Sequence, residues 1–282
     1  MTTSAQDQLS ALAHELELPI VLSFHGVENE IVKVRLNRPK QLNCIPPALH
    51  NKFDAFWTKF EQLAPLRVAI LTGTGRVFCA GADLKAWLDN PDSAVDSNGM
   101  NSGFLGISNR SNAKPIIAAL NGSSYGGGTE TIVNCDLVVA VRSATISLPE
   151  VHRGVAAVAG ALPRLGRNVT IQRANQLALM GEPISAATAE QWGLVNALAD
   201  SVEDLDALAL KFAASIIKGC PESVFVSQRG VRKGYEQTTL SLNEATDELA
   251  ANEMVHLQKS DNYIEGLTAF TEKRQPKWTS KL

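Results

Sequence analysis

Three short apolar runs, each followed by a turn of small residues, constrain the fold of this chain more than any other feature. The runs are Val68-Ala69-Ile70-Leu71, Pro115-Ile116-Ile117-Ala118-Ala119-Leu120 and Leu137-Val138-Val139-Ala140-Val141. Their short length and continuous apolar character are typical of strands buried on both faces. Helical patterns separate the runs, and strands that alternate with helices favour a layered α/β domain with parallel pairing.

We predict three segments in this chain of 282 residues, a length typical of one large or two small domains. They are an N-terminal arm over 1–18, a core over 19–200 and a C-terminal all-helical region over 201–282. The helical region is expected because the strand patterns end near residue 200. A helical stripe replaces them, formed by Leu205, Leu208, Phe212 and Ile216 and stopped by Gly219 and Pro221.

Other patterns in the core predict a strand, a helix and a loop. Lys33 and Arg35 alternate with apolar neighbours, which predicts a half-buried strand. Pro46 and Pro47 open a helical pattern with an aromatic stripe on one face, which predicts core packing. Residues 90–112 are polar and contain several glycines, so we predict either a mobile loop that sets specificity or an inert surface insertion.

Composition argues against several classes of partner. The net charge of −3 provides no basic excess to neutralise a phosphate backbone, so we expect no nucleic-acid partner. No apolar run approaches the roughly 20 residues of a spanning helix, so we expect no membrane partner. Without a CxxC pair we expect reduced thiols and no metal at the four cysteines, Cys44, Cys79, Cys135 and Cys220.

Both ends of the sequence bear on localisation. No Lys or Arg precedes Lys33, so the N-terminus lacks the positive charge of a secretory or mitochondrial address. The tripeptide Ser280-Lys281-Leu282 has the form of a peroxisomal address. We therefore predict a location in the peroxisomal matrix and an import receptor as a partner.

Three segments carry the residues suited to chemistry, and each places small residues or a turn after a predicted strand. They are Phe78-Cys79-Ala80-Gly81-Ala82-Asp83-Leu84-Lys85, the stretch from Asn121 to Glu130, and Leu148-Pro149-Glu150 with the small-residue run that follows it to Ala161. Small residues let a backbone N–H group approach a ligand closely. N–H groups at a helix N-terminus also favour negative charge.

Two glutamates stand in apolar surroundings within these segments. Glu130 follows three glycines and precedes a mostly apolar stretch, and Glu150 follows a proline in a similar neighbourhood. A carboxylate in such a place is unfavourable unless it is paired or used. Two carboxylates beside two backbone N–H donors suit chemistry next to a carbonyl, because the donors stabilise an enolate oxygen while the carboxylates move protons.

The ordered series of motifs resembles the enoyl-CoA hydratase/isomerase (crotonase) superfamily from about residue 20 to 278. Its first part is Leu36-Asn37-Arg38-Pro39-Lys40, Leu42-Asn43, Leu71-Thr72-Gly73 and Phe78 to Leu84. Its second part is Lys114 to Gly122, Gly126-Gly127-Gly128-Thr129-Glu130, Cys135-Asp136, Pro149-Glu150, Ala189, Gly193-Leu194-Val195, Glu265-Gly266, Ala269-Phe270 and Glu272-Lys273-Arg274.

This resemblance implies a fold, an assembly and a substrate class. The fold is α/β, a crotonase-like spiral of ββα units with a C-terminal all-helical region that packs between subunits. Members form trimers or pairs of trimers, so the resemblance implies a homo-oligomer. The substrates are acyl-CoA thioesters, and no metal or redox cofactor takes part, because coenzyme A belongs to the substrate.

The resemblance also assigns site residues. The backbone N–H groups of Ala82 and Gly127 match the oxyanion hole, and Glu130 and Glu150 match the two catalytic glutamates of hydratases. The positions that match coenzyme A contacts are Lys40, Gln41, Leu42, Ala80, Asp83, Leu84, Lys85 and, often from a neighbouring subunit, Phe270 and Lys273. The acyl pocket is expected to involve Trp87, Tyr125 and Val158, of which Val158 replaces a glycine common in hydratases.

Retention of both glutamates favours hydration of a trans-2-enoyl-CoA, or the reverse dehydration. By family analogy Glu130 is the base that holds the water and Glu150 is the acid, although such a pair titrates jointly. A Δ3,Δ2-enoyl-CoA isomerase, which needs one base only, and a C–C lyase are the alternatives within the superfamily. A non-catalytic acyl-CoA-binding or scaffold protein is the alternative from another class.

Overall fold

The computed structural model describes residues 3–89, 102–236 and 239–279. Its strands form two sheets. The larger sheet has the order β1-β2-β3-β5-β7-β10 and contains β1 (Ile20–His25), β2 (Ile31–Leu36), β3 (Val68–Gly73), β5 (Ile116–Leu120), β7 (Leu137–Val141) and β10 (Ala197–Ala199). The smaller sheet has the order β4-β6-β8-β9 and contains β4 (Val77–Cys79), β6 (Ser123–Tyr125), β8 (Thr145–Ser147) and β9 (Ile184–Ser185).

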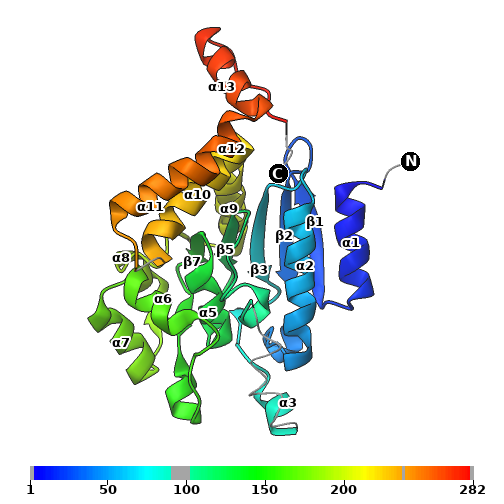
Figure 1. Ribbon diagram of the computed structural model, residues 1–282. Helices are drawn as coiled ribbons and strands as arrows, with labels where there is room; N and C mark the ends of the chain where they lie inside the picture. Colours follow the sequence, from blue (N-terminus) through cyan, green and yellow to red (C-terminus); the bar gives the residue numbers. More distant parts are fainter. Residues whose placement is uncertain (1–2, 90–101, 237–238, 280–282) are drawn as a thin grey trace.

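Helices surround these sheets (Figure 1). The α-helices are α1 (Ala5–Glu15), α2 (His50–Gln62), α3 (Leu84–Asp89), α5 (Gly127–Asn134), α6 (Ala161–Asn168), α7 (Ile171–Met180), α8 (Ala186–Gln191), α9 (Val202–Ile217), α10 (Pro221–Glu236), α11 (Leu242–Leu249), α12 (Val255–Gln258) and α13 (Asp261–Thr271). Short 3₁₀ turns are η1 (Pro39–Gln41), η2 (Pro47–Leu49), η4 (Phe104–Gly106) and η5 (Pro149–Arg153), and a π turn, η6 (Ala250–Met254), joins α11 to α12.

The chain advances by a repeated step that places one strand in each sheet. The pairs β3 with β4, β5 with β6, and β7 with β8 each make this step. The strands of successive steps pair in parallel in both sheets. This arrangement is the predicted spiral of ββα units, and the three apolar runs are the buried strands β3, β5 and β7 of its larger sheet.

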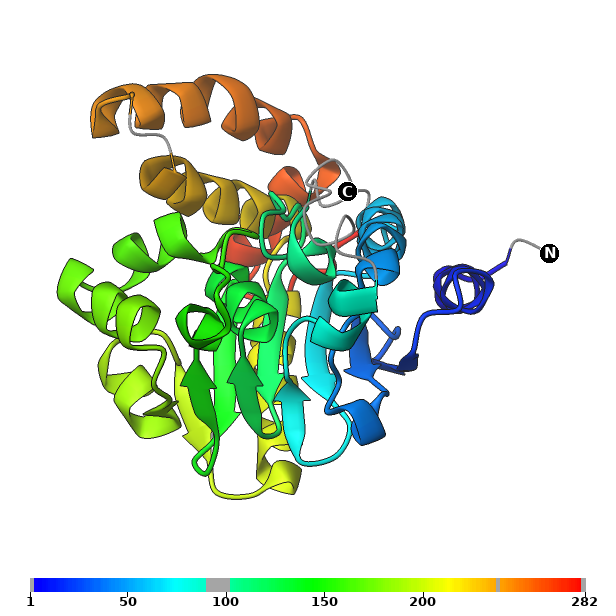
Figure 2. The same cartoon turned by 90° about the horizontal axis from the view of Figure 1, so that it is seen from below.

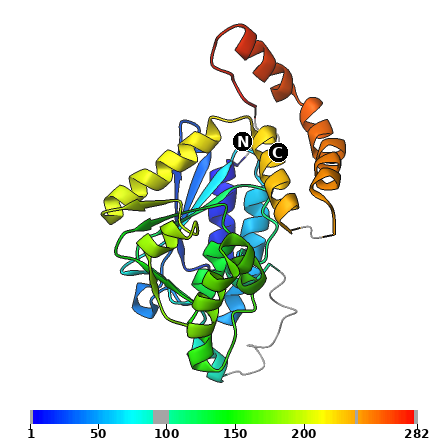
Figure 3. The same ribbon diagram turned by 90° about the vertical axis from the view of Figure 1, so that its left-hand side faces the viewer.

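The larger sheet is covered on both faces. α2 and α5 lie in front of it in Figure 1, and α9 lies across the opposite face, as Figure 3 shows from the side. α2 buries the predicted aromatic stripe completely, with Phe53, Phe56 and Trp57 at 0% exposure. α1 stands at the outer edge of the molecule beside β1 (Figure 2).

Two expectations from the sequence are wrong. β2 is not half-buried, because α9 covers the face that carries Lys33, and the Lys33 ammonium pairs with Asp206 of α9 at 2.9 Å. The part of the predicted surface loop that the structure describes is also buried, from Phe104 to Ser108. It packs between α2 and α5, where the Trp57 indole donates to the Leu105 carbonyl at 2.9 Å.

Beyond α9 the chain is helical, as the sequence predicts. α10 lies on the core, and α11 to α13 lead away from it, so that α13 forms the tip of the molecule opposite α3 (Figures 1 and 3). A capping box is present at the start of α11, where Ser241 and Glu244 satisfy each other's backbone amides.

The buried Asn43 side chain holds the turn before η2 against β4. Its amide nitrogen lies 2.8 Å from the Val77 carbonyl and 3.2 Å from the Phe78 carbonyl, and its oxygen accepts from the Arg38 amide at 2.9 Å. We expect Asn43→Ala to lower the free energy of unfolding by about 2–4 kcal/mol, because several buried polar groups lose their partner. Denaturant unfolding tests this, with Asn51→Ala on the exposed face of α2 as a near-neutral control.

Candidate active site

Three neighbouring parallel strands of the smaller sheet deliver the candidate site. Since carboxyl ends of parallel strands lie at the same edge of a sheet, the segments that follow β4, β6 and β8 meet there. These segments carry Ala82, Gly127 and Glu150 respectively. All three residues line one cavity of about 440 Å³, together with Glu130 of α5. Sites for small ligands typically measure about 300–1,000 Å³.

Two backbone N–H groups are available at this cavity. Ile45 forms a parallel bridge beside Ala82 by donating to the Gly81 carbonyl and accepting from the Asp83 amide. The Ala82 N–H group therefore points away from the bridge. Gly127 is the first residue of α5, where N–H groups have no partner within the helix. The positive end of the helix dipole adds to the attraction for a developing negative charge.

The two N–H groups are close because glycines let their segments touch. A Cβ atom on Gly81 would lie 2.8 Å from the Tyr125 carbonyl and 3.2 Å from the Gly127 nitrogen, and the φ of Gly81 is +87°. A Cβ atom on Gly127 would overlap the ring of Phe104. Only glycine fits these two positions, which makes the turns after β4 and β6 one continuous wall of the cavity.

Glu130 is the buried carboxyl group of the site. It lies in the first turn of α5 and is 4% exposed. Its Oε2 atom accepts from the Ala161 amide at 3.2 Å. Burial raises the pKa of Glu130 to about 7, and Glu150 raises it further, while the amides of Ala159, Gly160 and Ala161 act in the opposite direction.

Glu150 faces the same space from η5. A Cβ atom built on Gly126 would lie 3.0 Å from its Oε1 atom, so this carboxyl group rests on the turn that opens α5. Its Oε2 atom is buried without a hydrogen-bond partner among the described residues. Burial raises the pKa of Glu150. The site thus holds two carboxyl groups whose pKa values are both raised by burial, that of Glu130 to about 7.

Other groups complete the cavity wall. His50 accepts from the Leu105 amide at 3.3 Å, and burial lowers its pKa to about 4, so its ring is neutral. Tyr125 and Val158, both predicted for the acyl pocket, line the cavity. Arg153 also lines it, and among the described residues its guanidinium group has no hydrogen bond or ion pair.

The predicted coenzyme A contacts are only partly gathered at the cavity. Ala80 and Leu84 line it. Leu42 lies next to Ala80 and accepts from its amide at 3.0 Å, while Lys40 and Gln41 are exposed on the same turn. Asp83 faces Arg38 at 3.7 Å, and Lys85 is exposed.

Phe270 and Lys273 are not near the cavity within one chain. They lie at the end of α13, at the tip of the molecule opposite α3 (Figures 1 and 3), and the Phe270 ring is 84% exposed. Trp87 lies in α3, and its side chain is outside the described part of the structure. The same holds for Ser280, Lys281 and Leu282, so the peroxisomal address stays a sequence-based prediction.

His50 and Phe104 are not predicted from the sequence as parts of the site, and Arg153 follows the Leu148-Pro149-Glu150 segment without a predicted role. Phe104 follows a glycine in the presumed loop, and His50 begins the helix with the aromatic stripe, so neither position shows a pattern that indicates a cavity. Arg153 could have been found from its spacing to Glu150, because side chains three residues apart in a 3₁₀ turn lie on the same face.

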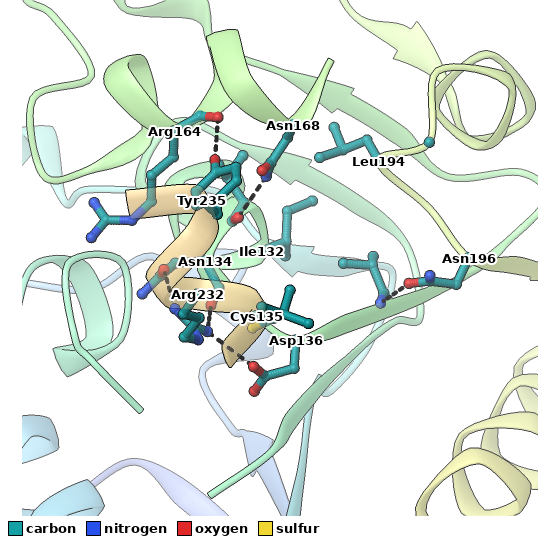
Figure 4. A pocket seen from close by; sticks show the side chains of 14 residues that line it. Ile132, Asn134, Cys135, Asp136, Arg164, Asn168, Leu194, Asn196, Arg232 and Tyr235 are labelled. Carbon is teal, nitrogen blue, oxygen red and sulfur yellow. Dashed lines mark hydrogen bonds and ion pairs between the residues drawn. The ribbon is translucent and has the colours of Figure 1, made fainter. Parts of the chain in front are cut away.

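A second cavity, of about 250 Å³, lies between α10 and the end of α5 (Figure 4). Its polar groups bind each other: Arg232 pairs with Asp136 at 3.0 Å, and the Tyr235 hydroxyl donates to the Arg164 carbonyl at 2.6 Å. These bonds join α10 to the core, so this cavity lies at the contact between the C-terminal helices and the core.

Two further features of residues 3–89, 102–236 and 239–279 bear on function. They contain no group of three or more His, Cys, Asp or Glu side chains arranged to hold a metal ion. None of the helices in these ranges combines the length and apolar character needed to cross a bilayer.

The chain belongs to the enoyl-CoA hydratase/isomerase family, which it matches over residues 26–281. It is 44% identical to the mevalonyl-coenzyme A hydratase of Aspergillus fumigatus, over 96% of this chain and 98% of that protein. It is 31% identical to the carnitinyl-CoA dehydratase of Escherichia coli, over 92% of this chain and 99% of that protein. A crystal structure of an enoyl-CoA hydratase from Mycobacterium tuberculosis superposes with a TM-score of 0.82 at 34% identity, over 93% and 99% of the two chains.

The buried state of Glu130 predicts a pH-dependent loss of stability. Its pKa is raised from 4.5 to about 7, so the folded chain binds more protons than the unfolded chain between these values. The contribution of Glu130 to stability is therefore present at low pH and is lost as the pH rises through 7. Gln cannot ionise, so we expect Glu130→Gln to raise the free energy of unfolding by about 2–3 kcal/mol at pH 8 and far less at pH 5.

Denaturant unfolding at both pH values measures this difference. Glu190→Gln, on the exposed surface of α8, is the matched control and should behave alike at pH 5 and pH 8. An equal effect of Glu130→Gln at the two pH values would contradict the raised pKa.

Proposed function

We propose that this protein is a hydro-lyase that interconverts a 3-hydroxyacyl-CoA and the corresponding trans-2-enoyl-CoA. The observation that carries the proposal is a pair of glutamates, Glu130 buried and Glu150 half-buried, both with raised pKa values and facing one cavity beside the N–H groups of Ala82 and Gly127. Membership in the family supports an acyl-CoA substrate. No added cofactor is needed, because coenzyme A is part of the substrate.

The groups act in a balanced sequence. In hydration, the N–H groups of Ala82 and Gly127 draw charge onto the thioester oxygen and make the β-carbon electrophilic. Glu130, ionised, takes a proton from a water molecule whose oxygen bonds to the β-carbon. Glu150, protonated, gives its proton to the α-carbon as the enolate collapses. One water is added in total, and transfer of the proton from Glu130 to Glu150, which face the same cavity, restores the starting state of the enzyme. The reverse steps remove a water from a 3-hydroxyacyl-CoA.

This mechanism requires both carboxyl groups. We expect Glu130→Gln and Glu150→Gln each to lower kcat by about 10²–10⁴-fold, the range typical of general acid–base catalysis. The assay follows the absorbance of the conjugated enoyl thioester and identifies the product by a mass gain of one water. Near-native rates in both variants would exclude these roles, and turnover of 3-enoyl-CoA alone would identify an isomerase instead.

We further propose that the acyl group is short, branched and hydroxylated, as in mevalonyl-CoA. The likeness to the mevalonyl-coenzyme A hydratases of Aspergillus fumigatus and Beauveria bassiana, at 44% and 40% identity, supports this choice. Arg153 supports it independently. The Arg153 guanidinium group has no hydrogen bond or ion pair among the described residues, and it lies on the same η5 turn as Glu150. It can donate hydrogen bonds to a hydroxyl at the far end of the acyl group, and its charge repels a cationic acyl group.

Arg153 therefore distinguishes the two kinds of acyl group found in the names of the relatives. A carnitinyl group carries a quaternary ammonium, which Arg153 would repel, whereas a mevalonyl group is neutral. We expect Arg153→Gln to raise KM for mevalonyl-CoA about tenfold with little change in kcat, and to raise kcat/KM for carnitinyl-CoA about tenfold. Arg142→Gln, an exposed arginine paired with Asp200, is the control. Unchanged discrimination between the two substrates would refute this role of Arg153.

We propose a homo-oligomer, either a trimer or a pair of trimers, as the active state. Ile264, Leu267 and Phe270 are exposed at three-residue spacing on α13, which is typical of an apolar helix face that meets a partner. Phe270 and Lys273 would then contact the coenzyme A bound to a neighbouring subunit, since neither lines the cavity of its own chain.

A further inference from the structure

Three successive backbone amides surround the carboxyl group of Glu130. They belong to Ala159, Gly160 and Ala161, at the turn that opens α6. The Ala161 amide donates to Glu130 Oε2 at 3.2 Å. No side chain of this turn takes part, so the position of the Glu130 carboxyl group depends on how the peptide planes of the turn are oriented.

Two side chains hold these peptide planes from the opposite side. The Ser108 hydroxyl donates to the Ala159 carbonyl at 2.6 Å, and Arg164 Nη1 donates to the Gly160 carbonyl at 3.0 Å. In a planar trans peptide the C=O and N–H groups point in opposite directions. By holding the Ala159 carbonyl, Ser108 directs the Gly160 N–H group toward Glu130. Arg164 does the same for the Ala161 N–H group through the Gly160 carbonyl.

Ser108 is itself fixed by its surroundings. It is 0% exposed, and its hydroxyl also accepts from the Phe104 amide at 2.6 Å. A Cβ atom on Gly160 would overlap the Ser108 carbonyl, so only glycine lets the turn approach this closely. The ring of Phe104 covers Gly127. The Ser108 hydroxyl, which binds the Phe104 amide and the Ala159 carbonyl, therefore connects the cavity wall beside the Gly127 amide to the turn that holds Glu130.

Arg164 is held in a similar way. Its Nη1 atom also donates to Asn109 Oδ1 at 3.0 Å, on the segment that carries Ser108. The Tyr235 hydroxyl of α10 donates to the Arg164 carbonyl, and Arg167 of the same helix α6 donates to the Tyr235 carbonyl (Figure 4 shows the Tyr235 to Arg164 bond). α10 thus fixes α6, whose first turn faces Glu130.

We propose that Ser108 and Arg164 are positioning residues that orient two successive peptide groups, so that the Gly160 and Ala161 N–H groups hold the Glu130 carboxylate in place for proton transfer. Neither side chain lines the cavity. Their effect therefore reaches the reaction through the groups that they hold, which are the turn at 159–161 beside Glu130 and, for Ser108, also the Phe104 amide. This inference rests on the base role of Glu130 under the proposed function.

The expected signature is a shift in the pH dependence. An amide that donates to a carboxylate favours its ionised form, so loss of the donor raises the pKa of Glu130. The other titratable and charged groups around Glu130 are Glu150, His50, Tyr125 and Arg153 of the cavity wall, Arg164 of α6, and Cys79 of β4 behind α5. The pKa values of His50 and Cys79 are about 4 and about 12, well away from the value of about 7 for Glu130, and arginine stays charged.

The test compares Ser108→Ala, Ser108→Thr and Arg164→Gln by the pH profile of kcat for enoyl-CoA hydration. Hydration needs ionised Glu130, so the rate falls on the acid side of its pKa. We expect Ser108→Ala and Arg164→Gln to move this acid limb up by roughly half to one pH unit and to lower the plateau about three- to tenfold. Ser108→Thr retains the hydroxyl and should restore the native limb.

Ser124→Ala is the matched control, because Ser124 is equally buried but its hydroxyl accepts from Thr129 and does not bind the turn at 159–161. The proposal would be overturned if a folded Ser108→Ala or Arg164→Gln variant kept the acid limb of the kcat profile at its native pH. An equal shift of the acid limb in Ser124→Ala would also overturn it. If Ser108→Ala does not fold, Arg164→Gln and Ser108→Thr decide the question.

A second readout separates this proposal from the proposed reaction. The infrared carboxyl band that Glu130→Gln removes can be titrated without any substrate. We expect its midpoint to rise in Ser108→Ala by the same amount as the acid limb. Absence of turnover in the native chain, with the infrared shift still present, would reject the proposed reaction and leave the positioning role standing. An infrared midpoint that does not move would reject the positioning role.

Discussion

The parallel pairing of β4, β6 and β8 is the constraint on which the site depends. Each of these strands has three residues, and each ends where a functional segment begins. Their pairing brings the Ala82 amide, the Gly127 amide and Glu150 to one edge, although up to 68 residues of sequence separate them. A shift of one residue in this register would turn side chains to the other face of the sheet. The larger sheet and its helices act as the frame that holds these short strands in register.

Placing two carboxyl groups in one cavity lowers the stability of the folded chain and favours proton transfer. Burial and mutual repulsion raise the pKa of Glu130, and the amides at 159–161 limit that rise. The result is a group that can be ionised or protonated near neutral pH, as general acid–base catalysis requires. Glu150 has an oxygen without a partner among the described residues, which leaves it free to meet a water or a substrate carbon. Such a site is less stable than one in which every polar group has a partner.

The sequence predicts the long apolar strands and both glutamates, because continuous apolar runs and carboxylates in apolar stretches are strong local signals. It does not predict β4, β6 or β8, since three residues are too few for a periodic pattern. It also misplaces Lys33 and Ser108 at the surface, because polar residues are exposed in most chains. Both are buried here, Lys33 through its ion pair with Asp206 and Ser108 through its bonds to Phe104 and Ala159.

Buried polar side chains at this site mostly bind backbone groups. Asn43 holds the Val77 and Phe78 carbonyls of β4, Ser108 holds the Ala159 carbonyl, and Asn134 holds the Ile107 carbonyl at 2.6 Å. Each of these bonds sets the direction of a peptide group, and the proposed chemistry also uses peptide groups, at Ala82, Gly127 and Ala161. In contrast, η5 carries its two side chains, Glu150 and Arg153, on a single turn. Under the proposed function, specificity can therefore change at Arg153 while the buried polar bonds that orient the backbone amides stay as they are.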